Sequence, residues 1–195
     1  MKLDYPEGAT PLDPDEIVGL KLSHIETRGE LDQVEQQNIQ DGYHWLSRQR
    51  KYKAFLNEAF LKALHENLFG EVWAWAGKFR QTEKNIGIDP RQIPMELRNL
   101  LDDAKYWIEH DTYRREVFAA RFHHRLVKIH PFPNGNGRHA RIMTDVLLEK
   151  SLGVAPIYWG ADVLTKDNDH RKKYLNALRA ADGNDYDLLI EFVSK

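Results

Sequence analysis

Hydrophobic positions recur at helical spacing along most of the 195-residue chain. Along the segment 57–69 and just before it they lie four residues apart, at Leu56, Phe60, Leu64 and Leu68. Side chains spaced in this way share one face of a helix, and Gly70 supplies a stop. The pattern predicts an amphipathic helix over residues 57–69.

Several other segments carry the same helical signature. Thr27 and Glu30 have the spacing of a capping box, which predicts a helix from Thr27 through Trp45. Apolar spacing predicts further helices over residues 93–108 and 118–129. The second should stop at His130, because a proline disfavours helical geometry in the residue before it. We expect additional helices over residues 138–147, around 174–178 and around 188–192.

One stretch departs from helical periodicity. The segment EVWAWAGKFR, residues 71–80, ends in a glycine turn, and QTEKNIGI, residues 81–88, alternates before Asp89-Pro90 closes it. Alternation bounded by turn residues predicts a β-hairpin or extended flap. With six or seven helical segments against one hairpin, the predicted class is mainly α: an orthogonal helical bundle with a short β-hairpin flap.

The chain divides into an arm and one domain. Prolines punctuate the first 15 residues, and Asp13-Pro14 suits the start of a helix. We therefore expect an N-terminal arm over residues 1–26 and one helical domain over residues 27–195, a length that can bury a substantial core.

Composition narrows the classes of function. A formal charge of −2 gives no general attraction to nucleic acid or to an anionic membrane, so phosphate binding must be local. The absence of cysteine removes thiol catalysis and thiolate metal sites and agrees with a reducing compartment, so we expect a cytoplasmic protein. We expect no membrane span, because no segment approaches ~18 apolar residues.

The chemistry concentrates in HPFPNGNGRHAR, residues 130–141. Gly135, Asn136 and Gly137 tolerate positive φ, so the backbone can curl into a concave row of N–H donors before the helix expected near Arg138. A helix N-terminus adds partial positive charge to such donors. This segment, which we call the motif loop together with the start of its helix, therefore predicts an anion site.

Three side chains extend that site. Arg138 and Arg141 share a helix face in a first turn, where cations are unfavourable unless an anion lies between them. Arginine forks bind phosphate, and two of them suit a di- or triphosphate. His130, on the opposite lip of the loop, is placed to take a proton from an attacking hydroxyl, and Phe132 should anchor the loop from beneath.

HPFPNGNGRHAR resembles the Fic motif, in which His, any residue, Phe, any residue, Asp or Glu, then Gly-Asn-Gly-Arg precede two residues of any type and Arg. LHENLFGEVWAWAGKFR, NIGI and YLNALRAADGNDYDLLIEF are similar to the same family. The resemblance covers about residues 45–193. It implies a Fic-like helical core that binds a nucleotide, usually ATP, and transfers AMP to a hydroxyl of a protein substrate.

The resemblance also implies roles for individual residues. His130 would be the general base, and Phe132 the core anchor. The nucleotide-binding residues would be Asn134, Gly135, Asn136, Gly137, Arg138 and Arg141. The flap, residues 82–88, would hold an extended protein substrate by strand addition, a mode that reads backbone more than side chains. Its target-binding residues would be Thr82, Asn85, Ile86 and Gly87.

Asn134 departs from the family pattern, which has Asp or Glu there to hold Mg²⁺ against the phosphates. An amide oxygen is a weaker ligand than a carboxylate, so Mg²⁺ binding is expected but weakened. Three alternatives stay open: a metal held mostly by phosphate, slower transfer, or transfer of another phosphate-containing group.

The sequence also departs from the family pattern in the helix that inhibits many members. Many family members carry a helix whose glutamate pairs with the last arginine of the motif, here Arg141, and the usual pattern is Ser or Thr, three residues, Glu, then Gly or Asn. No segment fits it. Glu35 is the candidate inhibitory residue, with a solvated helix-face charge as the alternative. A separate antitoxin-like protein is the other source of such a glutamate.

Two rival functions remain. His123 and His130 are seven residues apart, with His124 beside the first, a spacing that allows a histidine metal site on one helix face. The other rival is a catalytically weak or silent module that binds a nucleotide or a partner.

Overall fold

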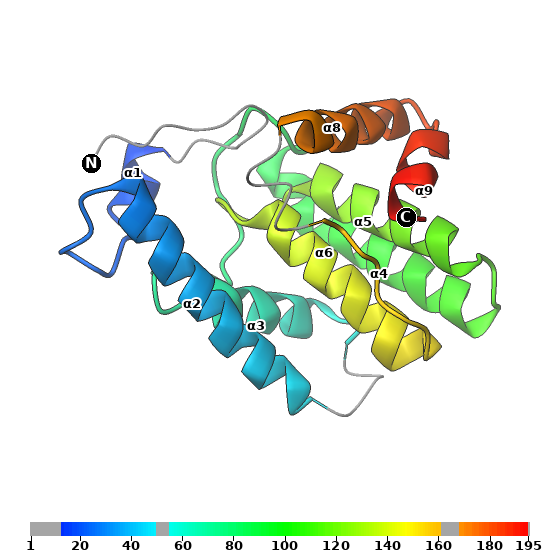
Figure 1. The fold of residues 1–195 in the computed structure, drawn as a ribbon, viewed down its shortest axis with the longest axis horizontal. Helices are drawn as coiled ribbons and strands as arrows, with labels where there is room; N and C mark the ends of the chain where they lie inside the picture. The colour runs from blue at the N-terminus through cyan, green and yellow to red at the C-terminus, as the bar shows by residue number, and fades with distance from the viewer. Residues whose placement is uncertain (1–12, 50–54, 161–167, 195) are drawn as a thin grey trace.

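The computed structural model describes residues 13–49, 55–160 and 168–194 (Figure 1). In these residues the regular structure is helical, and the β pairing consists of one isolated antiparallel bridge between Leu20 and Trp73. The elements are α1 (Pro14–Ile17), α2 (Arg28–Ser47), α3 (Glu58–Phe69), η2 (Pro90–Gln92), α4 (Ile93–Glu109), α5 (Arg115–Ile129), α6 (Asn136–Leu147), η3 (Leu148–Leu152), α8 (Asn168–Asp182) and α9 (Asp187–Val193). The mainly α class is confirmed.

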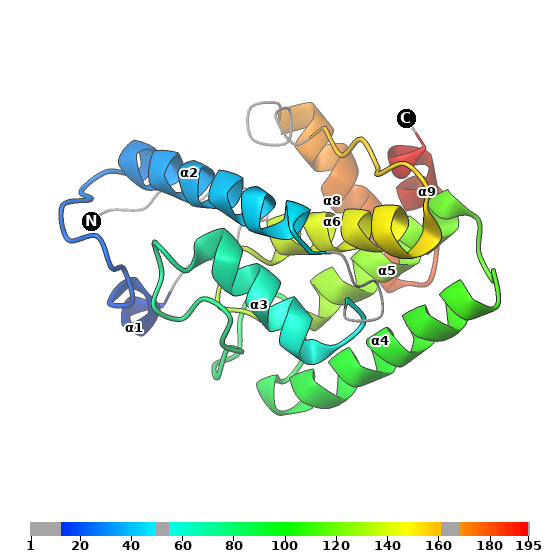
Figure 2. The same cartoon turned by 90° about the horizontal axis from the view of Figure 1, so that it is seen from below.

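Helix α6 lies at the centre of the bundle (Figures 1 and 2). It packs against α3 on one side and α5 on the other, while α2 packs along α3, and α8 and α9 pack together against α5. The loop before α6 is therefore surrounded by the ends of several helices. None of the helices in the described part of the chain is long and apolar enough to cross a membrane.

Local signals set the helix boundaries. Thr27 and Glu30 form the expected capping box at the start of α2, and the Asn57 side chain caps α3. Helix α5 ends before His130, which adopts a left-handed conformation with φ 53°. Helix α6 begins at Asn136, two residues earlier than expected, because Gly135 at φ 75° already turns the chain into the helix.

The hairpin prediction was wrong, since the described residues 81–89 contain no strand. The Arg80 side chain is buried and donates to the carbonyl of Thr82 over 2.8 Å and to that of Ile88. The Arg80 guanidinium thus bonds to two backbone carbonyls. In a hairpin, such carbonyls would accept from N–H groups of the opposite strand. We keep the name flap for residues 82–88.

Part of the predicted arm packs on the flap; residues 1–12 lie outside the described residues. The Lys84 ammonium forms an ion pair with Asp13 over 2.8 Å and another with the carboxylate of Glu16. The Thr82 hydroxyl also donates to Asp13, and Trp75 donates to the Glu16 carbonyl, each over 3.0 Å. These contacts dock α1 against the flap.

The α3 core supports the motif loop, so its packing should dominate stability. Leu64 is fully buried, and Leu64→Ala is expected to lower the free energy of unfolding by about 2–5 kcal/mol through lost burial and a cavity. The matched control is Leu188→Ala, because Leu188 is 49% exposed. Chemical denaturation measures both, and equal losses would contradict this account of the core.

Candidate functional site

The motif loop is closed by one buried side chain. The amide of Asn136 accepts from the Phe132 N–H over 2.9 Å and donates to the Phe132 carbonyl over 2.8 Å. Asn136 is 3% exposed, so these bonds form away from water. Its side chain therefore fixes the loop that delivers the chain to α6, a role that the sequence interpretation assigned to its backbone alone.

Phe132 anchors the loop from beneath, as expected. Its ring is fully buried and stacks on the His65 ring with centroids 3.7 Å apart. His65 accepts from the Gly77 N–H over 3.0 Å through Nδ1, which leaves Nε2–H to donate to the Asn134 carbonyl over 3.1 Å. Sequence analysis missed His65, because only the fold brings α3 beneath the loop.

The start of α6 is where the sequence predicts an anion site. A Cβ on Gly135 would lie 2.8 Å from the Phe69 ring, so only glycine fits there. At Gly137 the nearest atom to such a Cβ is Arg141 Nη1 at 3.7 Å, so this side of the turn is open. Gly137 and Arg141 are half-buried, whereas Gly135 is buried. The open side of the turn at Gly137 thus lies beside the Arg141 guanidinium.

The two motif arginines have different surroundings. Arg138 Nη1 donates to Glu35 Oε2 over 2.7 Å, and its guanidinium lies 4.7 Å from the centre of the Phe69 ring. Arg141 lies near Tyr174 of α8: burial raises the pKa of the Tyr174 hydroxyl, and Arg141 opposes that rise.

Glu35 faces the site from α2. It is 5% exposed, so the solvated alternative is wrong, and its second carboxylate oxygen accepts from Trp73 Nε1 over 2.7 Å. The resemblance implied Arg141 as the partner of an inhibitory glutamate, whereas the structure pairs Glu35 with Arg138. The Glu35 carboxylate is therefore bonded to one of the two guanidinium groups that are expected to hold phosphate.

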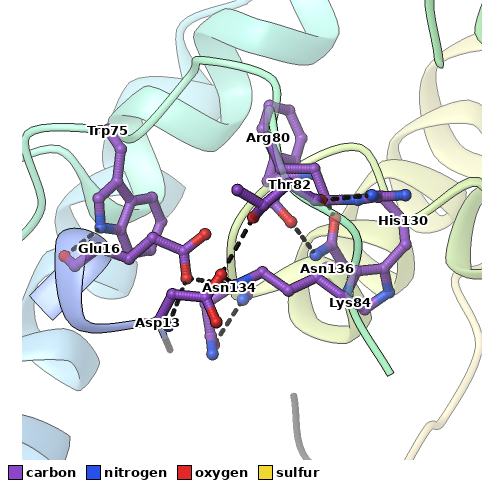
Figure 3. Close-up of polar contacts among 11 residues, drawn as sticks. Asp13, Glu16, Trp75, Arg80, Thr82, Lys84, His130, Asn134 and Asn136 are labelled. Atoms are coloured by element: carbon purple, nitrogen blue, oxygen red, sulfur yellow. Dashed lines mark hydrogen bonds and ion pairs between the residues drawn. The ribbon is translucent and has the colours of Figure 1, made fainter. Parts of the chain in front are cut away.

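His130, which the sequence analysis placed on the opposite lip of the motif loop, is buried beneath the flap (Figure 3). Its residue exposure is 4%, and a Cβ on Gly87 would lie 2.7 Å from His130 Cβ. Burial first, and then the positive charge of Arg80, lower the pKa of His130 to about 4. The imidazole is consequently neutral near pH 7, which is the form that accepts a proton.

The four flap residues singled out from the sequence form an exposed strip over that histidine. Thr82, Asn85, Ile86 and Gly87 are all exposed. Ile86 is among the large apolar side chains that face solvent, at 42% exposure.

Asn134 does not provide a ready magnesium site. Its Oδ1 accepts from the Gly135 N–H over 2.7 Å, so the amide oxygen already serves the loop. The described residues also contain no group of three or more His, Asp or Glu side chains that could hold a metal. The residues around the loop therefore do not fit a protein-held Mg²⁺ ion.

The alternative prediction of a histidine metal site is wrong. His123 contacts the Tyr174 hydroxyl over 2.8 Å, and His124 contacts Asp182 over 3.0 Å. Both rings are buried, and neither joins His130 in a metal cluster within the described part of the chain. They pack and hydrogen-bond inside the bundle.

Comparison with known proteins identifies the domain type. The Fic/DOC family model matches residues 55–148. A protein adenylyltransferase Fic from Drosophila virilis is 30% identical over 135 residues, which cover 67% of this chain and 26% of that protein. The chain thus spans about a quarter of the length of that curated relative.

Solved Fic structures share the fold. BepC from Bartonella tribocorum, solved with AMPPNP, aligns with a TM-score of 0.68 at 16% identity, over 87% of each chain. The N-terminal Fic domain of a Bartonella quintana protein, solved with ADP, aligns with a TM-score of 0.69 at 19% identity, over 88% of this chain and 86% of that one.

The buried imidazoles predict acid lability. Burial lowers the pKa of His130 and of His139 to about 4, below the value of about 6.5 expected in the unfolded chain. Between these values the unfolded state binds more protons, so the stabilisation is complete above about pH 6.5 and is lost as the pH falls toward about 4.

We expect the free energy of unfolding to fall between about pH 7.5 and about pH 5 by on the order of 2 kcal/mol per buried imidazole. Urea denaturation across that interval measures it, and His130→Asn should reduce the loss. A stability that stays constant over the interval would contradict these pKa directions.

Proposed function

Because the chain belongs to the Fic/DOC family, we propose that it transfers AMP from ATP to a hydroxyl side chain of a protein substrate. The observation that carries the proposal is the position of a neutral imidazole, His130, at the end of α5, with the open turn at the start of α6 a few residues further on. Relatives support the choice: one is named an adenylyltransferase, and solved neighbours hold AMPPNP and ADP.

The chain's own groups supply binding and proton transfer. Phosphates bind at the start of α6, where the Gly137 N–H, the helix dipole and Arg141 attract negative charge. His130 accepts the proton as the substrate hydroxyl attacks the α-phosphorus. The new O–P bond forms as the bond to the bridging oxygen breaks, and pyrophosphate leaves.

Access to His130 requires the flap to shift, because Gly87 lies against the histidine. A protein substrate that pairs with the flap backbone would bring its hydroxyl to the same place. The exposed strip at residues 82 and 85–87 suits such docking. The docked substrate thus both moves the flap and presents the nucleophile.

Glu35 restrains the reaction in this proposal. Its carboxylate neutralises Arg138 and adds negative charge where a polyphosphate must bind. The buried Glu35 carboxylate also accepts from Trp73, which fixes it beside the Arg138 side chain, itself 32% exposed. An antitoxin-like partner stays a prediction of the resemblance; the chain already has a glutamate at its own site.

A binding-only module is the second candidate. It is favoured by Asn134, whose amide replaces the carboxylate that the family uses for Mg²⁺, and by the burial of His130. In that case the loop would hold a nucleotide without transferring it.

Transfer is tested with ATP labelled at the α-phosphate and a cell lysate. We expect protein labelling by Glu35→Gly, which frees Arg138, and at least about a hundredfold less labelling by Glu35→Gly/His130→Ala, because the general base is absent. Gln36→Gly is the matched control, since it puts glycine at an exposed neighbouring position of α2. Equal labelling with and without His130 would eliminate it as the base.

A titration with Mg²⁺ tests position 134. Asn134→Asp supplies a carboxylate at the loop, so transfer should reach half its maximal rate at a lower Mg²⁺ concentration, by about tenfold, the factor that one ionic contact commonly contributes. Asn99→Asp, on the exposed side of α4, controls for the added charge. An identical titration curve in Asn134→Asp would show that this position does not face the metal.

A further inference from the structure

Arg80 is a buried cation outside the motif loop. It is 2% exposed, and its side-chain hydrogen bonds all end on backbone carbonyls. The acceptors are His130 at 2.6 Å, Thr82 at 2.8 Å, Ile129 at 3.4 Å and Ile88. One guanidinium therefore joins the end of α5 to both ends of the flap.

Two of these carbonyls belong to the end of α5. The last carbonyls of a helix have no partner within the helix and carry its partial negative charge. Arg80 satisfies those of Ile129 and His130 with a cation, and the Arg80 N–H adds a bond to the Pro131 carbonyl over 2.9 Å. These bonds hold His130 at φ 53°, a conformation that is uncommon for a residue with a side chain.

The other two carbonyls fix the flap over the histidine. Thr82 and Ile88 are six residues apart, and their bonds to one side chain close the intervening loop. Gly87 then lies against both partners, since a Cβ there would be 2.7 Å from Arg80 Nη2 and 2.7 Å from His130 Cβ. Flap position and histidine orientation are thus set by the same group.

Charge around His130 comes mainly from this side chain. The groups that face the imidazole are Arg80 and Lys84 from the flap side and the Val127 carbonyl from its own helix. The Lys84 ammonium is paired with Asp13 and Glu16, whereas Arg80 bonds only to neutral carbonyls. Arg80 is therefore not paired directly with a carboxylate, and Asp89, Glu83 and Glu16 act on its charge from further away.

We propose that Arg80 is the positioning residue for His130: it fixes the left-handed turn that orients the imidazole and holds the flap closed over it. The functional meaning of this role rests on the proposed transfer reaction. The geometric claim does not, because the accessibility and titration of His130 can be measured without any substrate.

Carbethoxylation by diethylpyrocarbonate at neutral pH tests accessibility. In Arg80→Met the His130 rate is expected to rise at least about tenfold, the factor for loss of one charge-assisted hydrogen bond. His65 and His139, both fully buried in the core, should stay protected, which separates flap opening from unfolding. Arg98→Met, at an exposed arginine of α4, is the matched control and should leave the His130 rate unchanged.

Arg80→Lys keeps the charge but lacks the planar fork, so a smaller rise at His130 is expected. The result counts for each variant in which His65 and His139 stay protected. If His130 is carbethoxylated in such a variant at the wild-type rate, the proposal is overturned. Loss of protection at His65 and His139 in both variants would also overturn it, because Arg80 would then stabilise the whole fold rather than this histidine.

An NMR titration of His130 gives a readout that a purely structural role would not produce. Removing the cation in Arg80→Met should raise the pKa of His130 by about one unit, and Arg80→Lys should restore part of the difference. If the pKa rises while the Glu35→Gly variant transfers no nucleotide, the positioning role stands and the proposed function fails. If transfer occurs but the His130 titration is unchanged, the positioning role fails alone.

Discussion

The two hydrogen bonds between the Asn136 side chain and the Phe132 backbone are the constraint on which the site depends. They close the loop between α5 and α6 around a buried aromatic ring, so the chain enters α6 at a fixed point. The open turn at Gly137 and the two arginines take their positions from that point. Without this closure, the helix N-terminus and His130 would be separate features of the bundle.

Around this loop, the fold keeps imidazoles neutral and concentrates permanent charge on arginines. Burial lowers the pKa of His65, His123, His130 and His139, so none of these rings competes with the guanidinium groups for an anion. Arg141 lies beside the open turn, Arg138 is held by Glu35, and Arg80 is enclosed by carbonyls. The three arginines thus have different surroundings, and we propose a different role for each: binding for Arg141, restraint through Arg138 and positioning for Arg80.

Sequence reasoning predicted what local interactions determine. The capping box at Thr27, the helix stop at His130 and the burial of Phe132 each follow from neighbouring residues, and all are confirmed. The hairpin prediction failed because the buried Arg80 side chain bonds to the carbonyls at the two ends of the flap. The burial of His130 was not predicted, because only the fold places Gly87 against it. The partner of Glu35 was also unpredictable, since Arg138 lies 103 residues away and only the packing of α2 brings them together.

The structure of the Glu35→Gly variant with a non-hydrolysable ATP analogue tests the central claim most directly. The account predicts that the phosphates lie against the Gly137 N–H and between Arg138 and Arg141, with the α-phosphate nearest to His130. Phosphates bound elsewhere on the bundle, with the start of α6 facing only solvent, would contradict it.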